Sequence, residues 1–249
     1  MPTTTTKTKT QRSAFPEIAP TSERAWLAWS RERAPLDATS MFDRAARVVV
    51  VSPHPDDETL ACGGLLARLR ALDVDVLVVA VTDGEGSHPG VGELAEIRTL
   101  EQRRALGRLG VQRAPIRLGL PDAAVAHHAA ELRDRLSAMV RPNDVVVAPW
   151  SRDGHTDHDA CGSAAEAVAT AVDCALLEYP VWAWQWAAPS DLAALTWERF
   201  APGRAAVQAK TAALECFPSQ TTDRFGAVIV DPVALTRFRR PFEVFTCVR

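Results

Sequence analysis

The sequence predicts a single Rossmann-like α/β domain, in which helices flank a mostly parallel sheet. Short apolar segments typical of strands alternate with segments of helical periodicity along most of the chain. The first clear strand, 47–52, contains the valine run 48–51 and is apolar on both faces, as a central parallel strand must be. With 249 residues, 47% of them hydrophobic, the chain can bury one generous core, and no long linker divides it.

The first 22 residues are rich in Thr, Pro, Lys and Ser and offer almost nothing to bury. We therefore expect a disordered tail at 1–22 and a folded domain over 23–249. Lys7 and Lys9 stand among threonines without an apolar block, so this tail lacks the features of a secretory signal. No apolar run approaches the roughly 20 residues that a membrane-spanning helix needs. These observations predict a cytoplasmic protein without a membrane span.

The elements of the domain follow in order from their patterns. A short amphipathic helix is predicted from Glu23, because Trp26 and Trp29 recur at helical spacing. After strand 47–52, leucines at helical spacing predict a helix over 58–72, which completes a βα unit. The alternation then predicts strands at 74–81, 116–118, 144–150 and 175–179, and helices at 94–109, 126–139, 157–172 and 204–217. In such a sheet the active site lies beyond the carboxyl ends of the strands, which here are followed by 52–58, 82–92, 119–123 and 150–158.

The turn after strand 47–52 is dense in ionisable groups. His54 stands between two prolines, and Asp56, Asp57 and Glu58 follow it. Two carboxylates about 4 Å apart in a partly desolvated turn repel each other by about 4 kcal/mol at an effective dielectric of 20. The dipole of the following helix offers only about 0.3–1 kcal/mol in return. A divalent cation would compensate the repulsion, so the turn indicates a metal site.

A second cluster, containing Asp153, His155, Asp157 and His158, follows strand 144–150. Parallel winding can place it at the same edge of the sheet as the first cluster. Histidine and aspartate ligands together fit zinc or ferrous iron better than magnesium or calcium, and three protein ligands leave a position for water, as in catalytic zinc sites. Either cluster alone could merely cap a helix, but the two together favour a shared metal site.

The two motifs, His54-Pro55-Asp56-Asp57-Glu58 and His155-x-Asp157-His158, resemble those of the PIG-L/LmbE-like deacetylases. The resemblance extends from about 47 to 220 through matches in the same order: Thr82-Asp83-Gly84-Glu85, Arg98-x-x-Glu101, Leu118-Gly119-Leu120-Pro121-Asp122, Lys210 and Ser219-Gln220. It implies a zinc-dependent hydrolase that removes acetyl groups from N-acetylglucosaminyl substrates, including precursors of low-molecular-weight thiols, glycolipids and antibiotics.

The resemblance also implies a role for each matched residue. The metal, Zn²⁺ or alternatively Fe²⁺, would be bound by His54, Asp57 and His158. Asp56 would be the general base. A protonated His155, favoured and oriented by Asp157, would stabilise the oxyanion.

Three residues are the predicted substrate contacts: Arg98, Asp122 and Asp153. Arg98 could alternatively form an ordinary ion pair with Glu101 on the same helix. Asp153 stands where some members of the family have a tyrosine, and it could instead orient a neighbouring histidine. Thr156 stands where the family frequently has proline. These departures leave the metal site intact, but they put in doubt the transfer of a substrate from the thiol-precursor enzymes.

Several other side chains have ordinary structural interpretations. Glu58 is expected to act as a helix-start acid rather than to form hydrogen bonds around the turn. His88, in the glycine-rich loop 84–92, is expected to be exposed. In an extended segment Trp182, Trp184 and Trp186 would share one face, and we favour packing against a helix or a partner subunit over stacking on a sugar.

Composition limits the choice of partner. The net charge is −3 and the charges are interspersed, which argues against nucleic acid and leaves a small amino sugar or glycoconjugate as the expected partner. Five cysteines without a C-x-x-C spacing indicate reduced thiols. A homo-oligomer stays open. Two other functions are alternatives: a metal-dependent phosphoesterase or esterase, and a non-catalytic sugar- or nucleotide-binding module. No G-x-G-x-x-G follows a predicted strand, which argues against the binding module.

Overall fold

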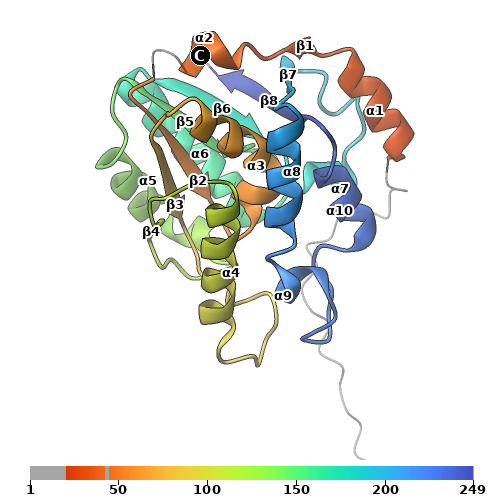
Figure 1. The fold of residues 1–249 in the computed structure, drawn as a ribbon. Helices are drawn as coiled ribbons and strands as arrows, with labels where there is room; N and C mark the ends of the chain where they lie inside the picture. The colour runs from red at the N-terminus through yellow and green to blue at the C-terminus, as the bar shows by residue number, and fades with distance from the viewer. Residues whose placement is uncertain (1–20, 43–44, 249) are drawn as a thin grey trace, which may run out of the picture.

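The computed structural model describes residues 21–42 and 45–248 (Figure 1). Most of the predicted tail, 1–20, therefore lies outside the described residues. Ser22 is within them, and its side chain accepts a hydrogen bond from the Ala25 N–H to cap the first helix. No helix in the described part of the chain is both long and apolar enough to cross a membrane.

One eight-stranded sheet organises the described residues, in the order β1-β7-β8-β6-β5-β2-β3-β4. Its strands are β1 (Ala34–Pro35), β2 (Arg47–Ser52), β3 (Val76–Ala80), β4 (Ile116–Arg117), β5 (Asp144–Pro149), β6 (Ala175–Tyr179), β7 (Trp197–Phe200) and β8 (Glu243–Val248). Neighbouring strands are parallel, except that β8 lies antiparallel between β6 and β7. The sheet is thus mostly parallel, as the sequence predicts.

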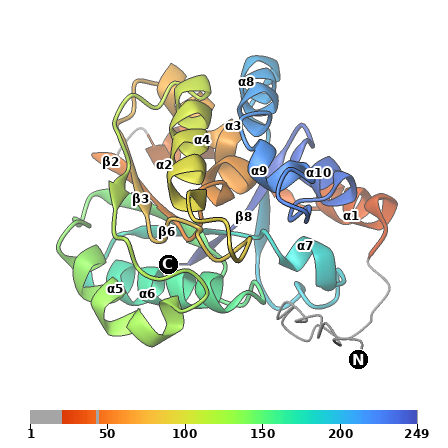
Figure 2. The same cartoon turned by 90° about the horizontal axis from the view of Figure 1, so that it is seen from below.

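Helices cover both faces of this sheet. Figure 2 shows α5 and α6 on one side and α3, α4 and α8 on the other. The helical elements are α1 (Glu23–Arg31), α2 (Ala38–Phe42), α3 (Asp57–Ala71), α4 (Leu94–Arg108), the 3₁₀ turn η1 (Val125–His128), α5 (Ala129–Ser137), α6 (Thr156–Val172), α7 (Ala183–Trp186), α8 (Arg204–Leu214), α9 (Pro218–Thr221) and α10 (Pro232–Phe238).

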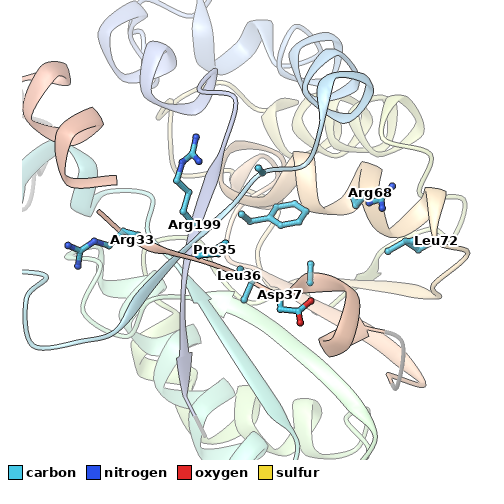
Figure 3. Close-up of a pocket in the computed structure, with 10 residues that line it drawn as sticks. Arg33, Pro35, Leu36, Asp37, Arg68, Leu72 and Arg199 are labelled. Atoms are coloured by element: carbon cyan, nitrogen blue, oxygen red, sulfur yellow. The ribbon is translucent and has the colours of Figure 1, made fainter. Parts of the chain in front are cut away.

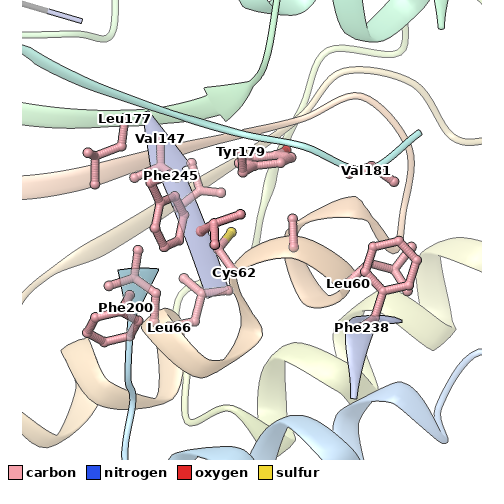
Figure 4. Close-up of a cluster of buried hydrophobic side chains, with 14 of the residues drawn as sticks. Leu60, Cys62, Leu66, Val147, Leu177, Tyr179, Val181, Phe200, Phe238 and Phe245 are labelled. Atoms are coloured by element: carbon pink, nitrogen blue, oxygen red, sulfur yellow. The ribbon is translucent and has the colours of Figure 1, made fainter. Parts of the chain in front are cut away.

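The valine run of β2 explains why this strand is central. Val48 and Val50 belong to the core cluster that contains α3, whereas Val49 and Val51 belong to the cluster on the opposite face, with α5 and α6. Because successive side chains of a strand point to opposite faces, a strand covered on both sides must be apolar throughout. Figure 4 shows part of the first cluster, where Cys62 and Leu66 of α3 lie toward Phe245 of β8 and Leu60 lies beside Phe238.

Most predicted elements are confirmed, two of them, β2 and β6, at the predicted bounds. The segment 126–139 begins as η1 and continues as α5 instead of forming one helix. Sequence patterns missed β1, α2, α7, β7, α9, α10 and β8. Each of these has seven residues or fewer, too short for a periodic signal, and the strands among them are defined by pairing with distant segments.

The topology places a crevice at the centre of the sheet. From β2 the chain continues to β3 and β4 on one side, and then crosses to β5 and β6 on the other. The carboxyl ends of β2 and β5 therefore lie side by side at the point where the strand order reverses, which is where open α/β sheets bind ligands. The two sequence clusters follow these two strand ends.

Candidate metal centre

Three side chains direct their ligand atoms at one another at the ends of β2 and β5. His54 Nδ1 lies 3.1 Å from Asp57 Oδ2 and 3.2 Å from His158 Nε2, and the Asp57 and His158 atoms are 3.2 Å apart. All three residues are buried. Atoms placed tetrahedrally at about 2.0–2.1 Å from one ion are about 3.3–3.4 Å apart. The triangle formed by His54 Nδ1, Asp57 Oδ2 and His158 Nε2 therefore has the size that a single zinc-sized ion requires. Among the described residues, this group is one of two that could hold a metal.

Local backbone structure builds each half of the triangle. The His54 N–H donates to Asp57 Oδ2 at 2.9 Å, and the His54 carbonyl accepts hydrogen bonds from the N–H groups of Asp56 and Asp57, which forms a tight turn before α3. His158 lies in the first turn of α6. Gly154, with a φ of 88°, turns the chain from β5 toward α6, a conformation that favours glycine.

Carboxylates hold the outer ring nitrogen of both histidines. His158 Nδ1 lies 2.8 Å from Asp153 Oδ2, and His54 Nε2 lies 3.2 Å from Asp122 Oδ1 and 3.3 Å from Asp157 Oδ2. A carboxylate beside one ring nitrogen keeps the proton there and leaves a lone pair on the other. The inner nitrogens of His54 and His158 are thus prepared as ligand atoms, and the donor set fits a metal ion.

The electrostatics of the cluster also favours a cation. Burial by itself lowers the pKa of His54, but hydrogen bonds to the surrounding carboxylates raise it well above its ordinary value. Burial likewise lowers the pKa of His158, whereas the charge of Asp57 and the hydrogen bond to Asp153 raise it to about 9. The carboxylates therefore attract positive charge to this point, whether as protons or as an ion.

Asp56 lies beside the triangle at the N-cap position of α3 and is 5% exposed. Burial raises its pKa to about 6, although the charge of Arg98 opposes this shift. Arg98 Nη2 donates to Asp56 Oδ1 at 3.1 Å, and its Nη1 donates to the Gly84 carbonyl at 3.0 Å. The alternative of an Arg98–Glu101 pair is wrong, because the Glu101 carboxylate accepts hydrogen bonds from Ser219 instead.

Asp157 orients His155 through its main chain rather than through its carboxylate. The Asp157 carboxylate lies against His54 and accepts hydrogen bonds from the N–H groups of Ala123 and Val125. The main-chain N–H of Asp157 donates to His155 Nδ1 at 3.2 Å, and the charge of the Asp157 carboxylate favours the protonated ring. Burial, followed by the positive charges of His158 and His54, lowers the pKa of His155 to about 4. A lowered pKa favours the neutral ring, and the hydrogen bond at Nδ1 then places the ring proton on Nε2.

Two of the predicted substrate contacts serve the histidines in this structure. Asp153 has no exposed surface, so the prediction that it contacts a substrate is wrong, and its alternative role of orienting a histidine is the one that the geometry supports. Asp122 accepts a hydrogen bond from the Gly86 N–H at 2.8 Å through Oδ2, while its Oδ1 faces His54. Burial by itself raises the pKa of Asp122, but the hydrogen bond to His54 outweighs this effect. The pKa of Asp122 therefore lies well below its ordinary value.

Glu58 lies in the first turn of α3, as expected, but it also forms the hydrogen bonds around the turn that were the alternative. Its side chain is fully buried, accepts a hydrogen bond from the Ser52 hydroxyl at 2.5 Å and another from Gln102 Nε2 at 3.2 Å, and so ties the turn to β2 and α4. Burial raises the pKa of Glu58 to about 7. Sequence analysis missed Gln102, because it gives no signal until α4 packs beside the turn.

The prediction that His88 is exposed is wrong, whereas the packing expected for the tryptophans is confirmed for Trp184. His88 is buried, with Nε2 2.9 Å from the Ala227 carbonyl, because loop 84–92 packs on a segment far away in sequence. The tryptophans do not share the face of an extended segment, because 183–186 is the short helix α7. Trp184 is buried in the core, as the packing interpretation expects. Trp182 stacks on His155, with ring centroids 5.8 Å apart and an angle of 26° between the planes.

A topological signal could have found this contact with His155. Trp182 follows the carboxyl end of β6, which is a parallel neighbour of β5, so the turn after β6 belongs to the same edge as the two clusters. The predicted strand 175–179 therefore indicates 180–183 as a further segment of the active-site edge.

A cavity of about 360 Å³ lies elsewhere, lined by residues of β1, α2, β7 and the end of α3. Figure 3 shows that the guanidinium groups of Arg33, Arg68 and Arg199 point away from one another there. The three arginines therefore do not converge on a common anion in this cavity.

Comparison with known proteins agrees with this site. Residues 49–169, which contain both clusters, match the family model described as PIG-L, GlcNAc-PI de-N-acetylase. A diacetylchitobiose deacetylase of Thermococcus kodakarensis is 31% identical over 131 residues, covering 49% of this chain and 48% of the relative. A 1D-myo-inositol 2-acetamido-2-deoxy-alpha-D-glucopyranoside deacetylase of Corynebacterium jeikeium is 42% identical over 88 residues, covering 29% of this chain and 26% of the relative.

The chain thus spans a quarter to about half of the length of these two relatives. Among solved structures, the N,N'-diacetylchitobiose deacetylase of Pyrococcus horikoshii superposes with a TM-score of 0.57 at 24% identity, covering 84% of this chain and 83% of the other. At this identity the superposition shows a shared fold.

Proposed function

We propose that the protein is a metal-dependent hydrolase that removes an N-acetyl group from an N-acetylglucosamine-type sugar or glycoconjugate, a proposal supported by the match of residues 49–169 to the PIG-L family model. The observation that carries the proposal is the triangle of His54 Nδ1, Asp57 Oδ2 and His158 Nε2, with the Asp56 carboxylate beside it. The names of the two relatives, both deacetylases of acetamido sugars, support the class of substrate.

The proposed ion is Zn²⁺, with Fe²⁺ as the alternative, held by His54, Asp57 and His158. Two imidazole nitrogens and one carboxylate oxygen suit these ions better than Mg²⁺ or Ca²⁺, which prefer oxygen ligands. When bound, such an ion lowers the pKa of a coordinated water toward about 7 and polarises a carbonyl oxygen.

Asp56 is the proposed general base. Burial raises its pKa to about 6, close enough to neutrality for the carboxylate to accept a proton from water and to release it again. Asp56 takes that proton as the water oxygen attacks the amide carbon, and it delivers the proton to the amine nitrogen as the C–N bond breaks. Acetate and a free amino sugar result. Arg98 holds Oδ1 of this carboxylate in place throughout.

His155 is the proposed donor to the oxyanion. Because Nδ1 accepts the Asp157 N–H, the neutral ring carries its proton on Nε2 and can donate it in a hydrogen bond. Donors already in place where charge develops are worth about 3–4 kcal/mol in other hydrolases. Asp157 contributes through its main chain to His155 and through its carboxylate to His54.

Arg98 and Asp122 are the proposed sugar contacts, since each lies against a residue of the reacting centre, Arg98 on Asp56 and Asp122 on His54. Both side chains can form hydrogen bonds with hydroxyl groups. The cytoplasmic location and a homo-oligomer stay predictions.

A panel of N-acylated amino sugars, assayed for free amine with the zinc-loaded and the ferrous-loaded protein, tests the proposal. We expect release of amine from at least one N-acetylglucosamine derivative, none without metal, and a preference among the sugars that defines the substrate class. Tight binding of these sugars without release of amine would contradict the proposal and favour a binding module. Release of phosphate from sugar phosphates without any amide hydrolysis would favour a phosphoesterase.

A further inference from the structure

The turn that follows β6 surrounds the Asp153 carboxylate with hydrogen-bond donors. The N–H groups of Val181 and Ala183 donate to Oδ1, and that of Trp182 donates to Oδ2, each at 2.9 Å. Asp153 has no exposed surface, so these donors replace water completely. The remaining partner of Oδ2 is His158 Nδ1, at 2.8 Å.

This arrangement fixes the orientation of the Asp153 carboxylate. Three main-chain donors from consecutive residues fix the plane and position of the group, because a main-chain N–H cannot rotate as a side chain does. An ionised carboxylate only accepts hydrogen bonds, so it requires the proton of His158 to be on Nδ1. The Nε2 lone pair of His158 then points at the triangle.

The same turn also contacts His155, the other histidine of the second cluster, through the face of its ring. The Trp182 indole stacks on His155 from one side, and the rings of His54 and His158 lie with centroids 4.9 Å from that of His155. Stacking restricts rotation of the imidazole, while the Asp157 N–H fixes which nitrogen carries the proton.

The turn is itself anchored in the core. Trp184, two residues later, packs edge-to-face on Trp26 of α1, with ring centroids 4.9 Å apart. Trp186 Nε1 donates to the main-chain carbonyl of Asp153 at 2.7 Å. The turn is thereby attached both to α1 and to the loop that it supports.

We infer that the turn 181–183 is a positioning element for both histidines of the second cluster, acting on His158 through the Asp153 carboxylate and on His155 through the indole of Trp182. The part that concerns His155 rests on the proposed function, whereas the part that concerns His158 needs only the metal site.

Metal affinity tests the His158 part. Asp153→Asn removes the acceptor-only group, and we expect zinc binding, measured by competition with a chromophoric chelator, to weaken about 10- to 100-fold. Asp144→Asn is the matched control: this carboxylate is also buried and accepts a main-chain N–H and an arginine, but at the opposite end of β5. The control should keep wild-type affinity. Equal affinity in wild type and Asp153→Asn, or equal losses in both variants, would overturn the inference.

Kinetics and NMR test the His155 part. Trp182→Ala should lower kcat about 10- to 100-fold with a small change in KM and unchanged zinc affinity, and Trp182→Phe should recover most of the loss. Without the indole, the imidazole can rotate away from the Asp157 N–H that fixes its tautomer. In ¹⁵N NMR spectra of the zinc-loaded protein, His155 should therefore change from a single Nε2–H tautomer in the wild type to a mixture in Trp182→Ala. Trp197→Phe, which alters a buried indole of β7, should change none of these.

An unchanged His155 spectrum in Trp182→Ala would overturn this part of the inference. If no acylated sugar is hydrolysed, the proposed function fails, but the chelator titration and the NMR spectra still test the positioning of the two histidines. The two failures are therefore distinguishable.

Discussion

Helix α3 buries carboxylates at two points, and the two points differ in what balances the charge. At its first turn, Asp56, Asp57 and Glu58 are all buried, and the groups paired with Asp56 and Asp57 are Arg98 and two histidines. At the kink near Cys62, α3 contacts the single carboxylate of Glu243, which comes from β8. Two main-chain N–H groups of α3 and the ammonium group of Lys210 donate hydrogen bonds to this carboxylate.

The kink gives the helix a second N-terminus. Cys62 has non-helical angles, and the N–H groups of Gly64 and Leu65 donate to the two oxygens of Glu243 at 2.7 and 2.8 Å. Lys210 Nζ adds a third bond at 2.7 Å. A Cβ at position 64 would lie 2.8 Å from Pro202, so glycine permits this close approach.

The difference teaches how to separate a structural ion pair from a metal site. At the kink, one carboxylate meets one lysine and two N–H donors, which completes its hydrogen bonding. At the first turn, ring nitrogens face one another 3.2 Å apart across a shared carboxylate oxygen, an arrangement that places lone pairs together and is satisfied by an ion between them. The predictions below test this distinction.

His158→Ala should have the largest effect, because it removes one corner of the triangle. We expect zinc affinity to fall steeply and turnover to fall at least about 10³-fold, since an ion at a reacting centre contributes several kcal/mol. Chelator competition and the amine assay measure the two effects. A variant that retains both affinity and turnover would place the ion elsewhere and would remove the basis of the comparison.

Asp56→Asn should separate binding from catalysis within the first turn. Asp56 is not part of the ligand triangle, so we expect metal content to be retained while kcat falls about 10²- to 10⁴-fold. The wild-type rate should decline as the pH falls through about 6, because a base whose pKa is raised to that value becomes protonated below it. The variant should lack this dependence. Loss of metal together with activity would instead make Asp56 a ligand.

Lys210→Met should affect stability without affecting the metal site. It leaves the Glu243 carboxylate buried with two N–H donors and no cation, which should lower the free energy of unfolding by about 3–5 kcal/mol, measured with urea. The double variant Lys210→Met with Glu243→Gln should recover part of that loss. A decrease in zinc affinity parallel to the loss of stability would show that the two points of α3 are not independent.

Glu178→Gln should have the smallest effect on the free energy of unfolding. Glu178, at the end of β6, is buried and accepts a main-chain hydrogen bond from Ser151 at 3.0 Å, and burial raises its pKa to about 7. Because the raised pKa favours the neutral acid in the folded state, its contribution to stability is complete below about pH 4.5 and is lost as the pH rises through about 7.

The Glu178→Gln variant should therefore match the wild type near pH 5 and exceed its free energy of unfolding by about 1–3 kcal/mol near pH 8. Urea titrations at the two pH values measure this. A constant difference between the two proteins at both pH values would show that Glu178 does not titrate in this range.

The sequence predicted what depends on local pattern. Helical and strand periodicities located the central elements, and the all-valine run of β2 identified a strand covered on both faces. The rule that parallel strands present their carboxyl ends at one edge brought His54 and His158, 104 positions apart, to one place. The sequence alone therefore provides the ligand spacing and the resemblance to PIG-L proteins.

Only the tertiary structure decided which partner each buried polar group has. Glu58 pairs with Gln102 across 44 positions, His88 with the carbonyl of Ala227 across 139, and Asp153 with the turn after β6 across about 30. A buried donor or acceptor must find a partner once water is excluded, and packing of whole elements chooses which one is within reach. The sequence therefore fixes the atoms that can bind a metal, while the tautomers and orientations that make them ligands arise from contacts between distant segments.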